Sequence, residues 1–223
     1  MSAPRSTDFW SALSPPEAAA LQERGLRRTF ARGQALLHEG QIADRIFVLR
    51  AGRVKITSTT AAGREVVLAF RGPGELLGEL AALDGHPRSA SVVALEPVEV
   101  LALAPADFST FLAEHPAAAL KLLRMLSRRL REANTRQIEF AAQETLGRVA
   151  TRLVELSERF GERHDEHIEI ALPISQEELA GWVGASLEST VRALQTMRTL
   201  GWIETRRRSI RVLDAAALRR AAG

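Results

Sequence analysis

ISQEELAGWVGASLESTVRALQTMRTLGWIETRRRSIRVLD, at residues 174–214, is the segment that predicts the fold of the C-terminal part of the chain. Ser175 begins a Ser-x-x-Glu capping box, which predicts a helix starting at this point. Gly184 is expected to end that helix, and Ser186 to cap a second one. The two short apolar runs that follow are joined by the arginines at 206–208 and predict a hairpin. The stretch therefore predicts a helix-turn-helix followed by a β wing.

The second of these helices has two faces of different character. The face expected in the core repeats at i, i+4 and i+7 and holds Thr190, Leu194 and Met197. The opposite face, which stays free to meet a ligand, holds Leu187, Glu188, Val191 and Arg192.

Upstream lies a long stretch without proline, residues 117–161. Its apolar residues recur at steps of three and four, the pattern of a coiled-coil seam. These seam positions are Leu123, Leu126, Leu130, Ala133 and Phe140. The alternative is a helix that packs only on its own domain, but the arginine-rich far side favours a dimer helix. We expect the seam to end near Gln143, because Gly147 and the fresh run VATRLVEL indicate a second helix.

Residues 30–103 have a different sequence pattern from the rest of the chain. Short apolar runs rich in β-branched residues alternate with glycine turns, as is typical of an antiparallel β sandwich or roll. A short helix capped by Ser14 precedes them, and another, closed by Pro116, follows. The fold class is therefore α+β. Its expected parts are an antiparallel β-roll at 1–115, a dimerisation helix and hinge at 116–143, and a winged helix-turn-helix at 144–223.

The composition is that of a globular protein, with 46% hydrophobic and 26% charged residues in 223. Neither an apolar run long enough for a membrane span nor a secretory signal is found, so we expect a cytoplasmic protein. The absence of cysteine excludes disulfides and cysteine-bound iron–sulfur clusters. Residues 1–115 hold 12 basic and 13 acidic side chains, whereas residues 116–223 hold 18 and 14. This arginine excess suits phosphate recognition, although a GC-rich genome would also produce it.

One more stretch, GELAALDGHPRSA at residues 78–90, brings the acid Glu79 close in sequence to the base Arg88. Two interpretations follow from the residues. The two side chains converge on a ligand, or they form an internal ion pair within a structural turn.

With these parts in this order, the chain from about Leu13 to Leu213 resembles the cyclic-AMP receptor protein/FNR family of bacterial transcription regulators. The motifs GELAALDGHPRSA and QEELAGWVGASLESTVRAL carry the resemblance. It implies a cyclic-nucleotide-binding-type β-roll, a homodimer, and binding of double-stranded DNA at a pseudo-palindromic operator. The implied effector is cAMP or cGMP, and RNA polymerase is a further potential partner.

The resemblance also implies a ligand site in the glycine-rich cassette. Glu79 matches the carboxylate that accepts a hydrogen bond from the ribose 2′-hydroxyl. Arg88 matches the guanidinium that meets the cyclic phosphate bidentately, and Ser89 adds a hydroxyl donor. Backbone N–H groups at Gly78 and Leu80 are expected to complete an anion-binding nest.

The end of the ligand that carries the base is matched less well. In cyclic-AMP-responsive relatives the dimer helix offers two adjacent hydroxyl side chains, and these positions fall on Ala133 and Asn134 here. Ala133 has no hydrogen-bonding side chain, whereas Asn134 can both donate and accept. Cyclic AMP as the sole effector is therefore in doubt, and cyclic GMP stays open.

On DNA, the family's reading helix uses an arginine–glutamate pair followed by a second arginine. Glu188 and Arg192 match the last two and suit cytosine and guanine edges respectively. Leu187 replaces the first arginine, so we expect the operator to depart from the usual half-site at one base pair. The other expected DNA contacts are Ser175, Gln176, Ser186, Ser189, Arg206, Arg207 and Arg208.

Other chemistry is not expected from the sequence. His86 invites comparison with haem-binding relatives, but a lone histidine in a surface turn is usually only solvated. Catalytic Ser/His/Asp groupings, metal-ligand clusters and Walker loops are not found, and two further histidines sit in the polar loop ERHDEHIE at 162–169. Two alternatives stay open besides the ligand-controlled regulator. One is a constitutive DNA-binding regulator with an empty roll, and the other is a cyclic-nucleotide module that acts on a protein partner.

Overall fold

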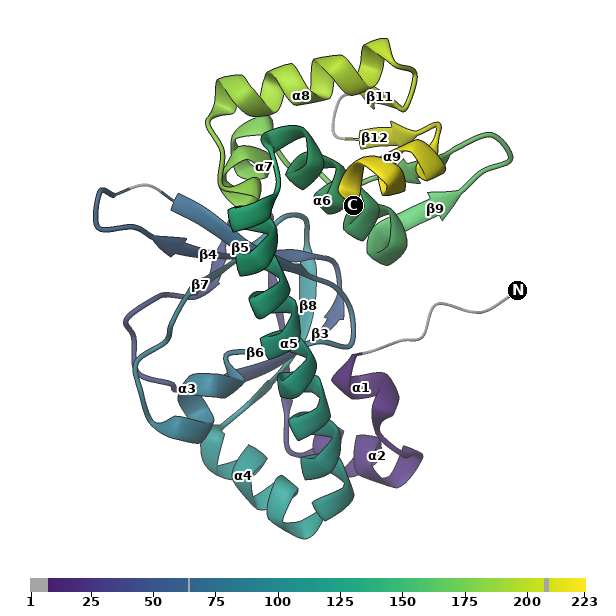
Figure 1. The fold of residues 1–223 in the computed structure, drawn as a ribbon. Coiled ribbons are helices and arrows are strands. Elements are labelled where there is room, and N and C mark those ends of the chain that lie inside the picture. The colour runs from purple at the N-terminus through teal and green to yellow at the C-terminus, as the bar shows by residue number, and fades with distance from the viewer. Residues whose placement is uncertain (1–7, 64, 207–208) are drawn as a thin grey trace. The chain divides into compact units, whose positions relative to one another are not determined.

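A computed structural model describes residues 8–63, 65–206 and 209–223. The chain divides into two compact units, with the boundary between Glu132 and Ala133, inside the long helix α5 (Pro116–Ala142; Figure 1). In the described residues, no helix is both long and apolar enough to cross a bilayer.

The first unit is an antiparallel β-roll with a few helices, as predicted. Its helices are α1 (Phe9–Ala12), α2 (Pro15–Glu23), α3 (Glu79–Asp84), α4 (Pro105–Glu114) and the first part of α5. Its strands are β1 (Leu26–Phe30), β2 (Ala35–Leu37), β3 (Ile46–Ala51), β4 (Val54–Thr59), β5 (Glu65–Arg71), β6 (Leu76–Leu77), β7 (Ser91–Ala94) and β8 (Val98–Leu103). They form two four-stranded sheets, in the orders β1-β8-β3-β6 and β2-β7-β4-β5.

Two apolar clusters hold this unit together. Side chains from both sheets form the first cluster, which includes Leu37, Phe47, Val54, Val92 and Val100. The helices and the outer side of one sheet form the second, which includes Phe9, Leu21, Phe108, Phe111 and Leu122. The second cluster matters for the site because it fixes the start of α5 against the roll.

The second unit begins with the end of α5 and contains the predicted winged helix-turn-helix. Its further helices are α6 (Thr145–Phe160), α7 (Gln176–Val183), α8 (Leu187–Thr199) and α9 (Ala215–Ala222). Its strands are β9 (Gly161–Arg163), β10 (Ile168–Ile170), β11 (Ile203–Arg206) and β12 (Ser209–Val212). They form one sheet in the order β11-β12-β10-β9.

The local signals in this unit are confirmed. The capping box joins Ser175 to Glu178, and Ser186 caps α8 by accepting a hydrogen bond from the Ser189 N–H. Gly184 ends α7 in the left-handed region, at φ +66°. One prediction was wrong, since the segment 162–169 is not a loop. It contains most of β9 and most of β10, because β10 pairs with the distant strand β12.

Gly184 allows a specific prediction about stability. A Cβ atom at Gly184 would lie 2.7 Å from the ring of Phe140, whereas at Gly201, with φ +72°, it would meet no atom of the described residues within 4 Å. Gly201→Ala should therefore lower the free energy of unfolding by about 1–2 kcal/mol through backbone strain alone. Gly184→Ala should cost about 1 kcal/mol more, because the ring must also move. Urea unfolding measures both, and equal costs would contradict the Phe140 contact.

Candidate effector pocket and nucleic-acid interface

The glycine-rich cassette begins with a close approach of backbone to side chain. Gly78 precedes α3 with φ +77°, a conformation that favours glycine. A Cβ atom here would lie 2.5 Å from Arg88 Nη1 and 2.6 Å from Leu37 Cδ1. Glycine thus lets the start of α3 pass directly over the guanidinium of Arg88.

Arg88 is buried, with 4% of its surface exposed. Its Nη2 donates to the carbonyl of Arg45 at 2.7 Å and to Asp44 Oδ1 at 3.1 Å, and its Nη1 lies 3.5 Å from the carbonyl oxygen of Gly78. The Asp44 side chain is 78% exposed. A buried guanidinium needs an anionic partner. Here the partner is the Asp44 carboxylate, which is exposed enough to turn away into solvent. Another anion of suitable shape can therefore replace it.

Glu79 directly follows Gly78, but it pairs with a different arginine. It is 3% exposed, and its Oε1 lies 2.6 Å from Arg129 Nη1 on α5. Arg129 Nη2 also donates to the carbonyl of Leu76 at 2.9 Å. Glu79 therefore pairs with Arg129, and Arg88 pairs with Asp44. The two residues of the cassette do not form the internal ion pair with each other that the sequence left open. The carboxylate of Glu79 is held at the surface of α5 that covers the roll.

The other predicted ligand residues lie in more open positions. Leu80 and Ser89 are exposed on the cassette. Ala133 and Asn134 are exposed on the part of α5 that belongs to the second unit. The structure therefore brings Gly78, Glu79 and Arg88 together, and Leu80 and Ser89 remain at the rim.

Sequence reasoning missed Asp44, Arg45 and Arg129. Only Arg129 leaves a local signal. Leu122 and Met125, three residues apart on α5, are both buried against the roll. Arg129 lies seven residues after Leu122 and so continues the same stripe. A charged residue on a buried stripe indicates a buried partner.

The predicted seam is largely uncovered in the single chain. Leu123 and Leu130 are 58% and 63% exposed, whereas Leu126 is half-buried against the core of the first unit. Ala133 is exposed, and Phe140 is 60% exposed although its ring also contacts the turn at Gly184. A row of exposed leucines on one helix is unusual for a surface that faces only water.

Helix α8 has the two faces that the sequence predicts. Thr190, Leu194 and Met197 are buried, and Leu187 and Val191 are exposed. Glu188 and Arg192 form an exposed ion pair at 3.4 Å, and both side chains are more than 70% exposed. The free face therefore presents one acid and one base between two apolar side chains.

Beside this face lies a hollow of about 500 Å³ between α8 and the start of α6. Its lining residues are Glu144, Thr145, Leu146, Arg148, Ser189, Arg192, Ala193 and Thr196. Arg148 and the first turn of α6 thus line a hollow beside Arg192, and their positive character suits a phosphate group. Sequence reasoning found Ser189 and Arg192 but not the contribution from α6, because nothing in the local pattern places α6 beside α8.

The remaining predicted DNA contacts are exposed or lie outside the described residues. The hydroxyl of Ser175 accepts a hydrogen bond from the Glu178 N–H at 3.0 Å, and Gln176 is exposed at the start of α7. Arg206 on the wing pairs with Glu204 at 3.1 Å. Arg207 and Arg208 lie outside the described residues.

Comparisons with known proteins match both domains of the chain. The model of the cyclic nucleotide-binding domain matches residues 27–115, and that of the Crp-like helix-turn-helix domain matches residues 147–221. The chain is 32% identical to the CRP-like cAMP-activated global transcriptional regulator of Mycobacterium tuberculosis, over 96% of each chain. It is 30% identical to the Cyclic AMP receptor protein of Thermus thermophilus, also over 96% of each chain. Among solved structures it is similar to the Catabolite Activator Protein of Thermus thermophilus, with a TM-score of 0.55 and 31% identity over 96% of this chain and 97% of that one.

Proposed function

The chain belongs to the cyclic-AMP receptor protein/FNR family of bacterial transcription regulators, and we propose that it is a homodimer controlled by a cyclic nucleotide. It is a DNA-binding regulator with a cyclic-nucleotide-binding domain. The observation that carries the proposal is the buried Arg88, whose only carboxylate partner among the described residues, Asp44, is exposed and can be displaced.

The effector would enter as the anion that replaces Asp44. Two oxygens of a cyclic phosphate would accept hydrogen bonds from the guanidinium of Arg88, whose planar fork fits them. The ribose 2′-hydroxyl would donate to Glu79, which already lies 2.6 Å from Arg129 on α5. The cAMP-activated regulator named above supports cyclic AMP, and the loss of a hydroxyl at Ala133 keeps cyclic GMP open. Contacts of Ala133 and Asn134 with the base stay predictions from the family resemblance.

DNA binding would follow from pairing of two chains along α5. The exposed leucines of the seam would bury one another, and two copies of α8 would enter successive major grooves about 34 Å apart. The hollow between α6 and α8 would hold a backbone phosphate, which positions Glu188 and Arg192 over the bases. Such a protein would act in the cytoplasm, where the chromosome lies, and RNA polymerase is a further proposed partner.

Coupling needs only a difference in effector affinity between two states of the dimer. A 100-fold preference for the DNA-binding state corresponds to about 3 kcal/mol. Glu79 supplies a physical link, because its partner Arg129 belongs to the helix that pairs the two chains.

One titration tests this proposal. Purified protein is titrated with cyclic AMP, cyclic GMP and 5′-AMP by calorimetry, and operator affinity is then measured with and without each nucleotide. We expect a cyclic nucleotide to bind and to raise operator affinity. Binding of 5′-AMP as tight as that of the cyclic nucleotides would contradict the fit of a cyclic phosphate.

A constitutive regulator is the second candidate, and one observation favours it. Arg88 and Glu79 both have ion-pair partners within the chain, so the charges of the pocket are compensated without a ligand. In that case operator affinity would stay the same with every nucleotide. A cyclic-nucleotide module acting on a protein partner is disfavoured by the Crp-like helix-turn-helix.

Arg192 allows a prediction about the DNA interface. Arg192→Ala should cost about 1–3 kcal/mol on the operator and much less on random DNA, because the side chain donates to one base. Fluorescence anisotropy at a fixed salt concentration measures both affinities, on an operator selected from random sequences. Arg198→Ala is the matched control on the same helix, since Arg198 is engaged by Thr205 at 3.1 Å. Equal losses for Arg192→Ala on both DNAs would assign this side chain to the backbone instead.

A further inference from the structure

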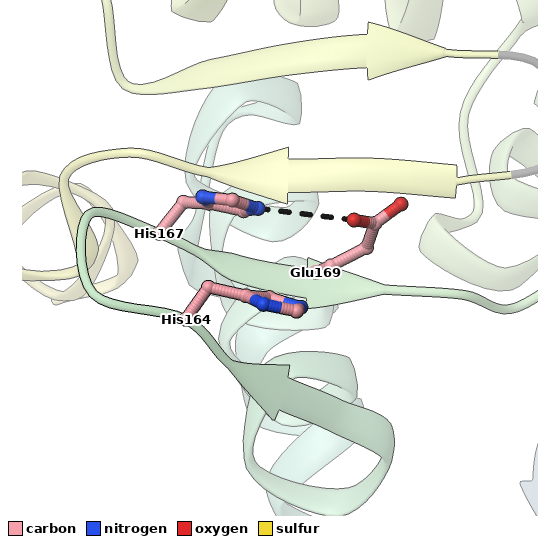
Figure 2. Close-up of side chains that lie close together, drawn as sticks. All are labelled: His164, His167 and Glu169. Carbon is pink, nitrogen blue, oxygen red and sulfur yellow. Dashed lines mark ion pairs between the residues drawn. The ribbon is translucent and has the colours of Figure 1, made fainter.

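A group of three side chains gathers on the β9–β10 hairpin. The turn is closed by the N–H of His164, which donates to the carbonyl of His167 at 2.9 Å. The two imidazole rings stack with centroids 4.8 Å apart and an angle of 17° between their planes. Glu169, two residues further along β10, turns its carboxylate toward His167 (Figure 2).

The distances between the ligand atoms are short. His167 Nε2 lies 3.7 Å from Glu169 Oε2, and one nitrogen or oxygen atom from each residue lies within 4.8 Å of the other two. His167 Nε2 is enclosed and makes no hydrogen bond with the described residues. An enclosed ring nitrogen without a hydrogen bond is costly, and a bound cation would satisfy it.

From this arrangement we propose that His164, His167 and Glu169 bind a divalent transition-metal ion of the zinc class. Two imidazoles and one carboxylate suit Zn²⁺, with water in the fourth position, whereas Mg²⁺ and Ca²⁺ prefer oxygen ligands alone. Bonds of about 2.1 Å in a tetrahedron place ligand atoms about 3.4 Å apart. The side chains therefore need to approach by about an ångström, which small χ rotations of three partly exposed groups can supply.

Acidic side chains near the group favour a bound cation, whereas one arginine opposes it. Asp165 and Glu166 form the tip of the turn, and strand pairing places Glu162 directly across from Glu169, on the same face. Arg211 opposes the metal, because its Nε lies 3.5 Å from Glu169 Oε2.

The site is independent of the proposed effector pocket but not of the wing. β10 pairs with β9 on one side and with β12 on the other, and β12 belongs to the wing hairpin. A metal held at the turn would stiffen the edge of the sheet that supports the wing. Metal binding at this turn is therefore independent of the identity of the effector.

The test uses the full chain without a histidine tag. Zn²⁺ binding is measured by calorimetry, and Co²⁺, which reports tetrahedral ligands by its visible absorption, serves as the spectroscopic probe. We expect one ion per chain and a rise in the melting temperature of the protein with Zn²⁺.

Variants locate the ion on these three residues. His164→Ala should weaken Zn²⁺ binding by about tenfold or more, and because this side chain is exposed the variant should fold normally. His86→Ala is the matched control, since that histidine is 80% exposed in another part of the chain, and it should leave binding unchanged. Arg211→Gln should tighten binding by several-fold, because a competing cation is removed.

Four results would overturn the proposal. The first is no stoichiometric Zn²⁺ binding to the wild-type chain. The second is unchanged affinity in His164→Ala, and the third is weaker binding in an Arg211→Gln variant whose circular dichroism and melting temperature without metal match those of the wild type. Loss of binding in His86→Ala would likewise place the ion elsewhere.

Discussion

Replacing Arg88 with leucine is expected to lower the affinity for a cyclic nucleotide by at least about 100-fold. The phosphate would lose two charge-assisted hydrogen bonds, each of which contributes about 1.5–3 kcal/mol. The roll should stay folded, because leucine fills part of the same space and Asp44 is already 78% exposed. The carbonyls of Arg45 and Gly78 would lose a donor, at a cost of about 1–3 kcal/mol in unfolding free energy.

Calorimetry with cyclic AMP and cyclic GMP checks this prediction, and circular dichroism checks the fold of the variant. Arg45→Leu is the matched control, since Arg45 is exposed and offers Arg88 only its carbonyl oxygen. It should bind nucleotide nearly as well as the wild type. If Arg88→Leu binds as tightly as Arg45→Leu, the phosphate lies elsewhere, and the buried arginine serves only the turn.

The second large effect is expected at the seam of α5. Leu130→Glu should convert the dimer to a monomer at micromolar concentration and lower operator affinity by at least about 100-fold. Each chain would lose the burial of one leucine, about 1.5–3 kcal/mol, and two carboxylates would face each other across the symmetry axis. The chain itself should fold normally, because Leu130 is 63% exposed in it.

Analytical ultracentrifugation measures the change in mass, and anisotropy measures the change in operator affinity. Ile42→Glu is the matched control, since Ile42 is 80% exposed in a loop of the roll and lies outside the predicted seam. It should leave both measurements unchanged. A Leu130→Glu protein that remains a dimer would place the interface on another surface.

Much of the C-terminal unit could be predicted from short segments of sequence. Ser175 and Ser186 cap their helices through N–H groups three residues away, so the signal and the structure lie within one helical turn. The burial of Thr190, Leu194 and Met197 follows from their spacing alone. The antiparallel roll was likewise predictable as a class, because its strands are short and turn residues separate them.

The candidate pocket was predictable only in part. Glu79 and Arg88 stand out in the cassette, but their partners do not. Arg88 reaches Asp44, 44 residues earlier, and Glu79 reaches Arg129, 50 residues later. Which charge faces which depends on how two sheets and a helix pack, and no local pattern records that packing.

The features that form within a few residues follow from the local sequence, namely the caps, the turn at Gly184, the two faces of α8 and the apolar row of α5. Which distant residues meet depends instead on how the elements pack. The clearest case is the segment 162–169, which contains four acids, an arginine and two histidines and was expected to be a loop. Pairing of β10 with β12 makes it a hairpin and brings His164, His167 and Glu169 together. Backbone hydrogen bonds to a strand about 40 residues away impose that conformation, and the local sequence cannot show that this partner exists.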